Sequence, residues 1–220
     1  MTMSLGRRTA AETLGTALLL VAVVGSGIMA EKLSGGNTGL ALLANAIATA
    51  AALYVLITIF GPISGAHFNP AVTAVMHVRG DVDLSSSLAY VFAQITGGLA
   101  GVILAHAMFD MALLQTSTTA RTGAGQWIAE FVAAFGLLTT ILGAIRFKPD
   151  AIPTAVALYI LSAYWFTAST SFANPAVTIA RAATNTFAGI APGDAPAFIV
   201  AQMLGAFAAL ALGRWLFSER

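Results

Sequence analysis

Residues 63–73 read Ile-Ser-Gly-Ala-His-Phe-Asn-Pro-Ala-Val-Thr, and residues 173–178 read Ala-Asn-Pro-Ala-Val-Thr. The shared Asn-Pro-Ala triplets lie 105 residues apart, at Asn69 and Asn174. Asparagine is a favoured residue just before a helix, and proline suits the first helical position because its missing N–H has no partner there. Each triplet, Asn69-Pro70-Ala71 and Asn174-Pro175-Ala176, therefore predicts the start of a short apolar helix.

Long uncharged stretches around the triplets indicate membrane spans. Of the 220 residues, 58% are hydrophobic and 9% are charged, against about 25% charged in a typical soluble domain. A helix needs about 20 apolar residues to cross a bilayer. The sequence therefore predicts an all-α membrane protein with six spans, at about 11–30, 41–60, 86–108, 126–146, 152–168 and 195–216. Two apolar segments, about 67–78 and 172–184, contain the triplets and are too short to cross.

The composition also excludes several classes of site. The chain has no cysteine, which excludes disulfides, thiol nucleophiles and thiolate metal ligands. With three histidines and nine carboxylates, we expect no metal site and no cofactor. A net charge of +1 gives no basic patch, so no nucleic-acid partner is expected.

The two halves of the chain resemble each other. Gln94 and Gln202 occupy matching spans, as do Glu12 and Glu130 near the start of each half. Because each half has three spans, the second half is inverted in the membrane relative to the first, and the functional site is expected at the midplane between them. We interpret residues 1–220 as one domain with repeats at about 1–110 and 124–220.

The basic residues predict the orientation. An even number of spans places both termini on one side, and the side richer in Lys and Arg faces the cytoplasm. The terminal side carries seven of these residues: Arg7, Arg8, Arg79, Arg146, Lys148, Arg214 and Arg220. The other side carries Lys32, Arg121 and Arg181. We expect both termini in the cytoplasm.

Two short helices that enter from opposite faces would meet with their N-termini at the midplane. Each N-terminus is equivalent to roughly half a positive charge, so the meeting point repels cations. The amides of Asn69 and Asn174 can donate hydrogen bonds to a passing oxygen. This arrangement is typical of a pore for neutral, hydroxyl-bearing solutes, and no enzymatic activity is expected.

The sequence resembles the aquaporins, the major intrinsic protein family, along essentially its whole length. The matching stretches are Ala11-Glu12 with Gly15-Thr16, residues 63–73, residues 94–98, Ala129-Glu130 and residues 174–176. The resemblance implies six helices, two re-entrant half-helices, one pore per subunit and a homotetramer. It also implies that Glu12 and Glu130 hold the half-helix loops. The backbone carbonyls that it implies along the pore are those of Gly65, Ala66, His67, Ser169 and Thr170.

One position departs from most of the family. Val177 stands where most aquaporins carry the arginine of their narrow constriction, directly after the second triplet. Counting back from the triplets places Thr49, Ser162 and Ser171 at the other three constriction positions. All four side chains are small and uncharged, so we expect a wide filter without the arginine that deters cations.

This variant resembles aquaporins found with bacterial arsenic-resistance genes. The expected permeants are arsenous acid, possible methylated derivatives of it, glycerol-sized polyols and some water. A general water channel is the alternative within the family. Arg181, one turn beyond Val177, could partly replace the missing arginine, lie at the surface or cap a neighbouring loop.

Two functions of other classes remain open from the sequence. An ion-coupled secondary transporter would have to use Glu12 and Glu130, the acids that lie inside spans. An intramembrane hydrolase would have to use Ser26 as its nucleophile and His106 as its base.

Overall fold

The computed structural model describes residues 3–218, and within that range it contains helices and no strand. Five helices are long and apolar enough to cross a membrane: α1 (Leu5–Leu33), α2 (Thr38–Ser64), α4 (Leu84–Met108), α5 (Ala124–Phe147) and α8 (Ala195–Leu216). The shorter elements are α3 (Pro70–Arg79), the 3₁₀ turn η1 (Pro149–Ala151), α6 (Ile152–Phe166) and α7 (Pro175–Arg181). The chain is a multi-pass membrane protein.

The fifth predicted span is shorter than expected. The sequence predicted residues 152–168, whereas α6 has 15 residues and ends at Phe166. An α-helix rises 1.5 Å per residue, so α6 covers about 22 Å of a hydrocarbon core about 30 Å thick. A turn at residues 167–170 and the irregular residues after it continue the chain to the second triplet.

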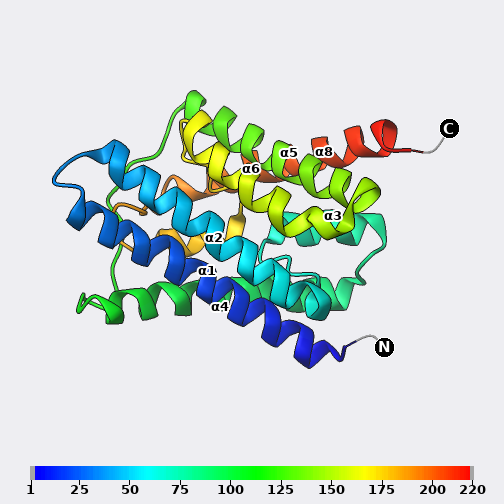
Figure 1. Cartoon of the computed structure of the whole chain (residues 1–220), viewed down its shortest axis with the longest axis horizontal. Coiled ribbons are helices and arrows are strands. Elements are labelled where there is room, and N and C mark those ends of the chain that lie inside the picture. The colour runs from blue at the N-terminus through cyan, green and yellow to red at the C-terminus, as the bar shows by residue number, and fades with distance from the viewer. Residues whose placement is uncertain (1–2, 219–220) are drawn as a thin grey trace.

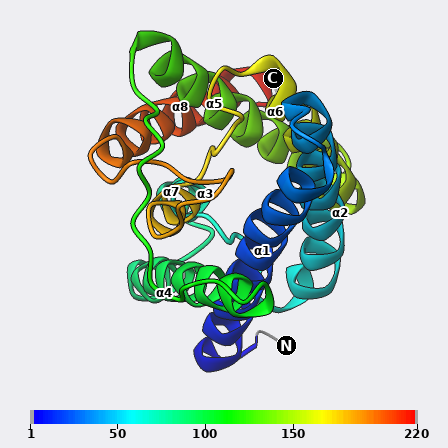
Figure 2. The same cartoon turned by 90° about the vertical axis from the view of Figure 1, so that its left-hand side faces the viewer.

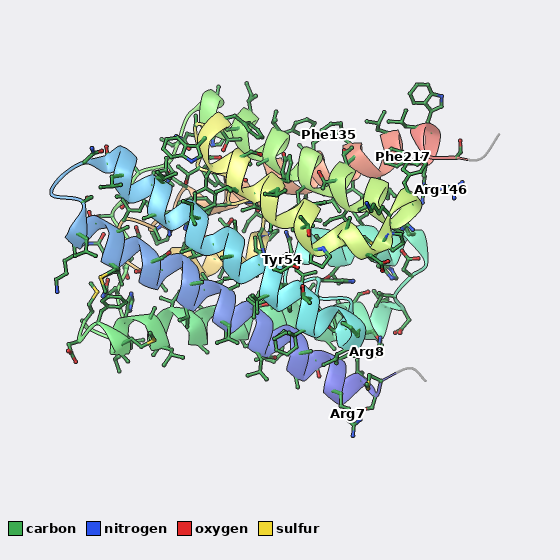
Figure 3. All side chains as sticks on the ribbon, viewed as in Figure 1. Arg7, Arg8, Tyr54, Phe135, Arg146 and Phe217 are labelled. Carbon is green, nitrogen blue, oxygen red and sulfur yellow. The ribbon has the colours of Figure 1, made fainter. Side chains whose placement is uncertain are left out.

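The long helices enclose the two half-helices. Viewed along the long axis of the molecule, α1, α2, α6, α5 and α8 follow one another around the centre, and α3 with α7 fills the space between α8 and α4 (Figure 2). Both ends of the chain lie at the same end of the molecule (Figure 1). Arg7, Arg8 and Arg146 lie at that end as well (Figure 3).

Both half-helices begin at the predicted prolines. Asn69 and Asn174 have extended backbone, and each side-chain oxygen accepts a hydrogen bond from the N–H of the alanine in its own triplet. Pro70 and Pro175 then occupy the first helical position. The local capping chemistry of the triplet is therefore sufficient to fix where each half-helix starts.

Glycines bring the spans of each half close together. A Cβ added at Gly97 or Gly101 of α4 would lie 2.3 Å or 2.2 Å from a backbone oxygen of α1. In the second half, a Cβ at Gly205 of α8 would lie 2.2 Å from the backbone oxygen of Phe131 in α5. Helices in a membrane associate by such close backbone contact, which small residues permit. These contacts hold the outer ring that positions the half-helices.

Candidate pore at the meeting point of the half-helices

A cavity of about 630 Å³ runs through the middle of the molecule. Arg8, at the end of the molecule that holds the termini, lines it (Figure 3). Arg79, the last residue of α3, and Arg181, the last residue of α7, line it at the ends of the half-helices that are remote from the triplets. Asn69 and Asn174 line it between these two ends. The cavity therefore follows the path that a solute would take across the membrane.

The wall of this cavity is amphipathic. Helices α1, α2, α5 and α6 contribute an apolar side, whereas the two triplets and the loops that precede them contribute amides and carbonyls. The residues of the apolar side include Leu19, Val23, Leu53, Ile57, Leu137, Ile141, Val156 and Ile160. Such a wall suits a solute that has both hydroxyl groups and an apolar face.

The two asparagines bind the opposite half of the chain. Asn69 Nδ2 donates to the carbonyl of Ala173, and Asn174 Nδ2 donates to the carbonyl of Phe68, each at 2.8 Å. A primary amide has two N–H groups, and within residues 3–218 no other hydrogen bond uses either Nδ2. Each asparagine therefore keeps one donor for a solute in the cavity.

Glu12 holds the loop before the first half-helix. Its carboxylate accepts hydrogen bonds from the backbone N–H of His67 at 2.9 Å and of Phe68 at 2.7 Å. It also accepts from the Ser64 hydroxyl at 2.6 Å and from Gln94 Nε2 at 2.8 Å. The Glu12 side chain is fully buried, so these donors are the groups that compensate its lost hydration.

Glu130 does the same for the second half-helix. It accepts hydrogen bonds from the N–H groups of Phe172 and Ala173, each at 2.9 Å, and from Gln202 Nε2 at 2.6 Å. The role that the resemblance implied for both glutamates thus agrees with the hydrogen bonds. Gln94 and Gln202 were noted in the sequence as an echo between halves, but their contacts with these carboxylates were not predicted.

The loops held by the glutamates have unusual backbone angles. Ala66 and Phe68 in the first half, and Ser171 and Ala173 in the second, have φ between 49° and 52°. Residues other than glycine rarely adopt this conformation, and each costs about 1–3 kcal/mol unless the surroundings hold it. The hydrogen bonds to Glu12 and Glu130 provide that support, and they turn the loops toward the cavity.

The carbonyl-bearing loops are not fully symmetric, and one expectation needs correction. Gly65, Ala66 and His67 line the cavity as expected, but Ser169 and Thr170 do not. The Ser169 carbonyl instead accepts a hydrogen bond from Arg121 Nη1 at 3.3 Å. In the second half the cavity is lined by the next three residues, Ser171, Phe172 and Ala173.

The constriction that was counted from the triplets also needs one correction. Thr49, Ser171 and Val177 line the cavity and are at most 5% exposed. Ser162 does not line it: the residue is exposed on the outer surface of α6, and its hydroxyl donates to the carbonyl of Tyr159. Tyr164 lies on the cavity instead, and its hydroxyl donates to Thr49 Oγ1 at 3.2 Å.

The geometry of α6 explains the difference. Successive residues of an α-helix are about 100° apart, so Ser162 and Tyr164 point in nearly opposite directions. Four residues at a spacing of four face the cavity: Ile152, Val156, Ile160 and Tyr164. This apolar row is visible in the sequence, and its spacing of four places Tyr164 on the same face of α6 as Ile160.

Single cysteines should distinguish the two faces of α6, because the chain has no cysteine of its own. A water-soluble thiol reagent should reduce solute flux through the Thr49→Cys variant to near the background of empty vesicles. The same reagent should leave the Ser162→Cys variant unchanged, since a thiol in apolar surroundings stays protonated and reacts slowly. If the reagent stops flux through the Ser162→Cys variant and leaves flux through Thr49→Cys unchanged, Ser162 lines the pore as the spacing from the triplet predicts.

The residues proposed for other functions are separated or occupied. The Ser26 hydroxyl donates to the carbonyl of Ala22 and accepts from Asn45, whereas His106 contacts Leu113 and Thr184. Ser26 and His106 therefore do not form a nucleophile–base pair. Among the described residues, no group of three or more metal-binding side chains occurs.

Comparison with known proteins agrees with this geometry. The family model described as "Major intrinsic protein" matches residues 1–149. The chain is 59% identical over 212 residues to "Aquaglyceroporin AqpS" of Rhizobium meliloti (strain 1021), which covers 96% of this chain and 91% of that protein. It is 38% identical over 136 residues to "Probable aquaporin TIP1-1" of Oryza sativa subsp. japonica, covering 60% of this chain and 54% of the rice protein.

One solved structure supports the fold. The aquaglyceroporin from Plasmodium falciparum superposes with a TM-score of 0.73, and the match covers 95% of both chains. The two sequences are 22% identical. The likeness therefore concerns the arrangement of the helices and half-helices.

Proposed function

Because this chain belongs to the major intrinsic protein family, whose members are channels and not enzymes, we propose that it is a passive pore for neutral solutes larger than water. The permeants that we propose are arsenous acid, its methylated derivatives and glycerol-sized polyols, together with some water. One observation carries this proposal: Val177, an apolar side chain, lines the cavity directly after the second triplet. A short apolar side chain at this point leaves room beside the path.

The polar groups along the cavity suit a small triol. Asn69 and Asn174 each offer a spare N–H, and the buried hydroxyl of Ser171 has no hydrogen-bond partner among the described residues. Glycerol and arsenous acid both carry three hydroxyls and are neutral at pH 7. Such solutes can exchange their hydrogen bonds with water for bonds to these groups, while their remaining surface contacts the apolar side of the wall.

The name of the Rhizobium meliloti relative, an aquaglyceroporin, favours a channel wide enough for glycerol over a strict water channel. An ion-coupled mechanism is disfavoured by the glutamates. Glu12 and Glu130 accept four and three hydrogen bonds, respectively, within the protein. A carboxylate engaged in this way is a structural support rather than an ion-binding site.

Stopped-flow light scattering on proteoliposomes tests the proposal. Vesicles that contain the protein should shrink and then re-swell faster than empty vesicles in gradients of glycerol and of arsenous acid, and should also pass water. Flux should rise linearly with the gradient, because a passive pore has no transport cycle to saturate. Acceleration for water alone would make the protein a general water channel, and flux that depends on an ion gradient would make it a transporter.

We further propose the cellular arrangement of this channel. Residues 1–220 form one channel domain, with repeats at about 1–110 and 124–220. It assembles as a homotetramer in the cell (inner) membrane with both termini in the cytoplasm. The basic end of the molecule and the positive-inside rule support this orientation. Large exposed apolar side chains on α2 and α6, such as Ile47, Tyr54 and Trp165, provide surface for lipid and for neighbouring subunits.

A further inference from the structure

We propose that Arg181 supplies a fixed positive charge to the outer constriction, one helical turn beyond the position where valine has replaced arginine. This inference rests on the proposed function, because it assigns a selectivity-determining residue to the same pore. The constriction would then be wide at Val177 and cationic at Arg181, instead of lacking a charge altogether.

The first support is the position of Arg181. It is the last residue of α7, and residues four apart lie one above the other on a helix. Arg181 is 3% exposed, and it lines the same cavity as Val177 and Ser171. The side chain is therefore turned inward along the path and does not reach the molecular surface.

The second support is that, among the described residues, no carboxylate is bonded to Arg181, and the buried Glu130 acts on its charge only from a distance. Arg181 Nε donates to the backbone carbonyl of Ala188, and the guanidinium lies over the Phe172 ring, 3.4 Å from its centroid. Within residues 3–218, no ion pair includes Arg181 and no hydrogen bond uses its terminal nitrogens. The planar end of the side chain thus keeps donors for a solute.

A second arginine strengthens the positive field at this end. Arg121 lies 5.1 Å from the centroid of the same Phe172 ring and does not line the cavity. Its guanidinium donates to the carbonyls of Gly189, Ser169 and Phe187, and its backbone N–H donates to the Asp194 carboxylate. Arg121 therefore holds the outer loop and adds to the potential without contacting the solute.

The two sections of the constriction, at Val177 and at Arg181, select solutes by size and by charge, respectively. A guanidinium repels cations, and its N–H groups bind the oxygens of hydroxylated solutes. The unpartnered hydroxyl of Ser171 lies on the same cavity. A neutral polyol can therefore exchange water for bonds to Arg181 and Ser171, and then pass the wider section at Val177, whereas a cation is stopped at Arg181.

Three variants test this role in proteoliposomes, with sodium and proton leak measured beside glycerol flux. Arg181→Met removes the charge and should raise the cation leak at least about tenfold, because a unit positive charge beside the path no longer repels cations. Arg181→Lys keeps the charge, so its sodium and proton leak should stay as low as that of the wild type. Lys32→Met changes the net charge equally at an exposed outer residue and should match the wild type.

The outcomes separate a charge effect from a loss of loop structure. An equal leak through Arg181→Met and Arg181→Lys would assign Arg181 to loop anchoring and overturn the inference, as would a tight Arg181→Met variant that still passes glycerol. If Arg181→Met does not fold, Arg181→Gln, which is uncharged but keeps amide donors, is compared with Arg181→Lys in the same way. A cation leak through Arg181→Gln and none through Arg181→Lys supports a charged filter, and an equal leak through both overturns it. Absence of any solute flux in the wild type would instead refute the proposed function.

Discussion

Replacing Val177 with arginine is expected to stop glycerol and arsenous acid while water still crosses. Val177 lies in the first turn of α7 on the wall of the cavity and is 5% exposed, so a longer side chain at this position extends into the path. The new guanidinium would also lie one turn from Arg181. We expect the permeability to both solutes to fall at least about tenfold, which corresponds to about 1.4 kcal/mol on the barrier.

Val177→Leu is the matched control, because it adds volume without charge. This variant should lose part of the flux of the larger solutes and should remain as tight to cations as the wild type. Stopped-flow measurements with water, glycerol and arsenous acid on the same vesicle preparations give the comparison. Unchanged glycerol flux through Val177→Arg would show that the narrowest section lies elsewhere, and would refute the assignment of Val177 to the filter.

Removing the carboxylate of Glu130 is expected to destabilise the protein by several kcal/mol. Glu130→Ala would leave the N–H groups of Phe172 and Ala173 and the amide of Gln202 buried without their acceptor. Each such group costs about 1–3 kcal/mol, and the whole stability of a typical domain is about 5–15 kcal/mol. Glu12→Ala should have a similar effect, because four hydrogen bonds end on that carboxylate.

Thermal unfolding of the detergent-solubilised protein measures this loss. Glu31→Ala is the matched control, since Glu31 is an exposed acid at the end of α1 and its removal should leave the melting temperature unchanged. Glu130→Gln keeps one oxygen acceptor and should fall between the wild type and Glu130→Ala. A Glu130→Ala variant as stable as Glu31→Ala would mean that the loop does not depend on the carboxylate.

The features that could be predicted from the sequence are those that local chemistry determines. Length and apolarity identified the long helices, and the cap formed by asparagine and proline placed the starts of α3 and α7 at Pro70 and Pro175. The repeated triplet also pointed to the junction of the two halves, where Asn69 and Asn174 line the cavity. Each of these depends on neighbours within a few residues, so no knowledge of the tertiary structure was needed.

The missed features depend on segments that are distant in the sequence. The count of twelve residues from Asn174 to Ser162 assumed a fixed loop length, whereas a turn at residues 167–170 separates α6 from the second triplet and Tyr164 lines the cavity instead. The burial of Arg181 depends on residues 182–194, whose carbonyl at Ala188 receives its Nε–H. Sequence spacing gives no information about how such a loop folds back.

The paired hydrogen bonds of Asn69 and Asn174 have a consequence for the biosynthesis of the protein. Each asparagine bonds to a carbonyl that lies 104 or 106 residues away, in the other repeat. At a synthesis rate of about 5–20 residues per second, the first half-helix waits roughly 5–20 s for its partner to be made. During that interval the amide of Asn69 and the carbonyl of Phe68 need another partner, such as water or the translocation machinery. The first half of the chain, from α1 to α4, is therefore an unfinished intermediate until the second triplet and the helices that enclose it have been synthesised.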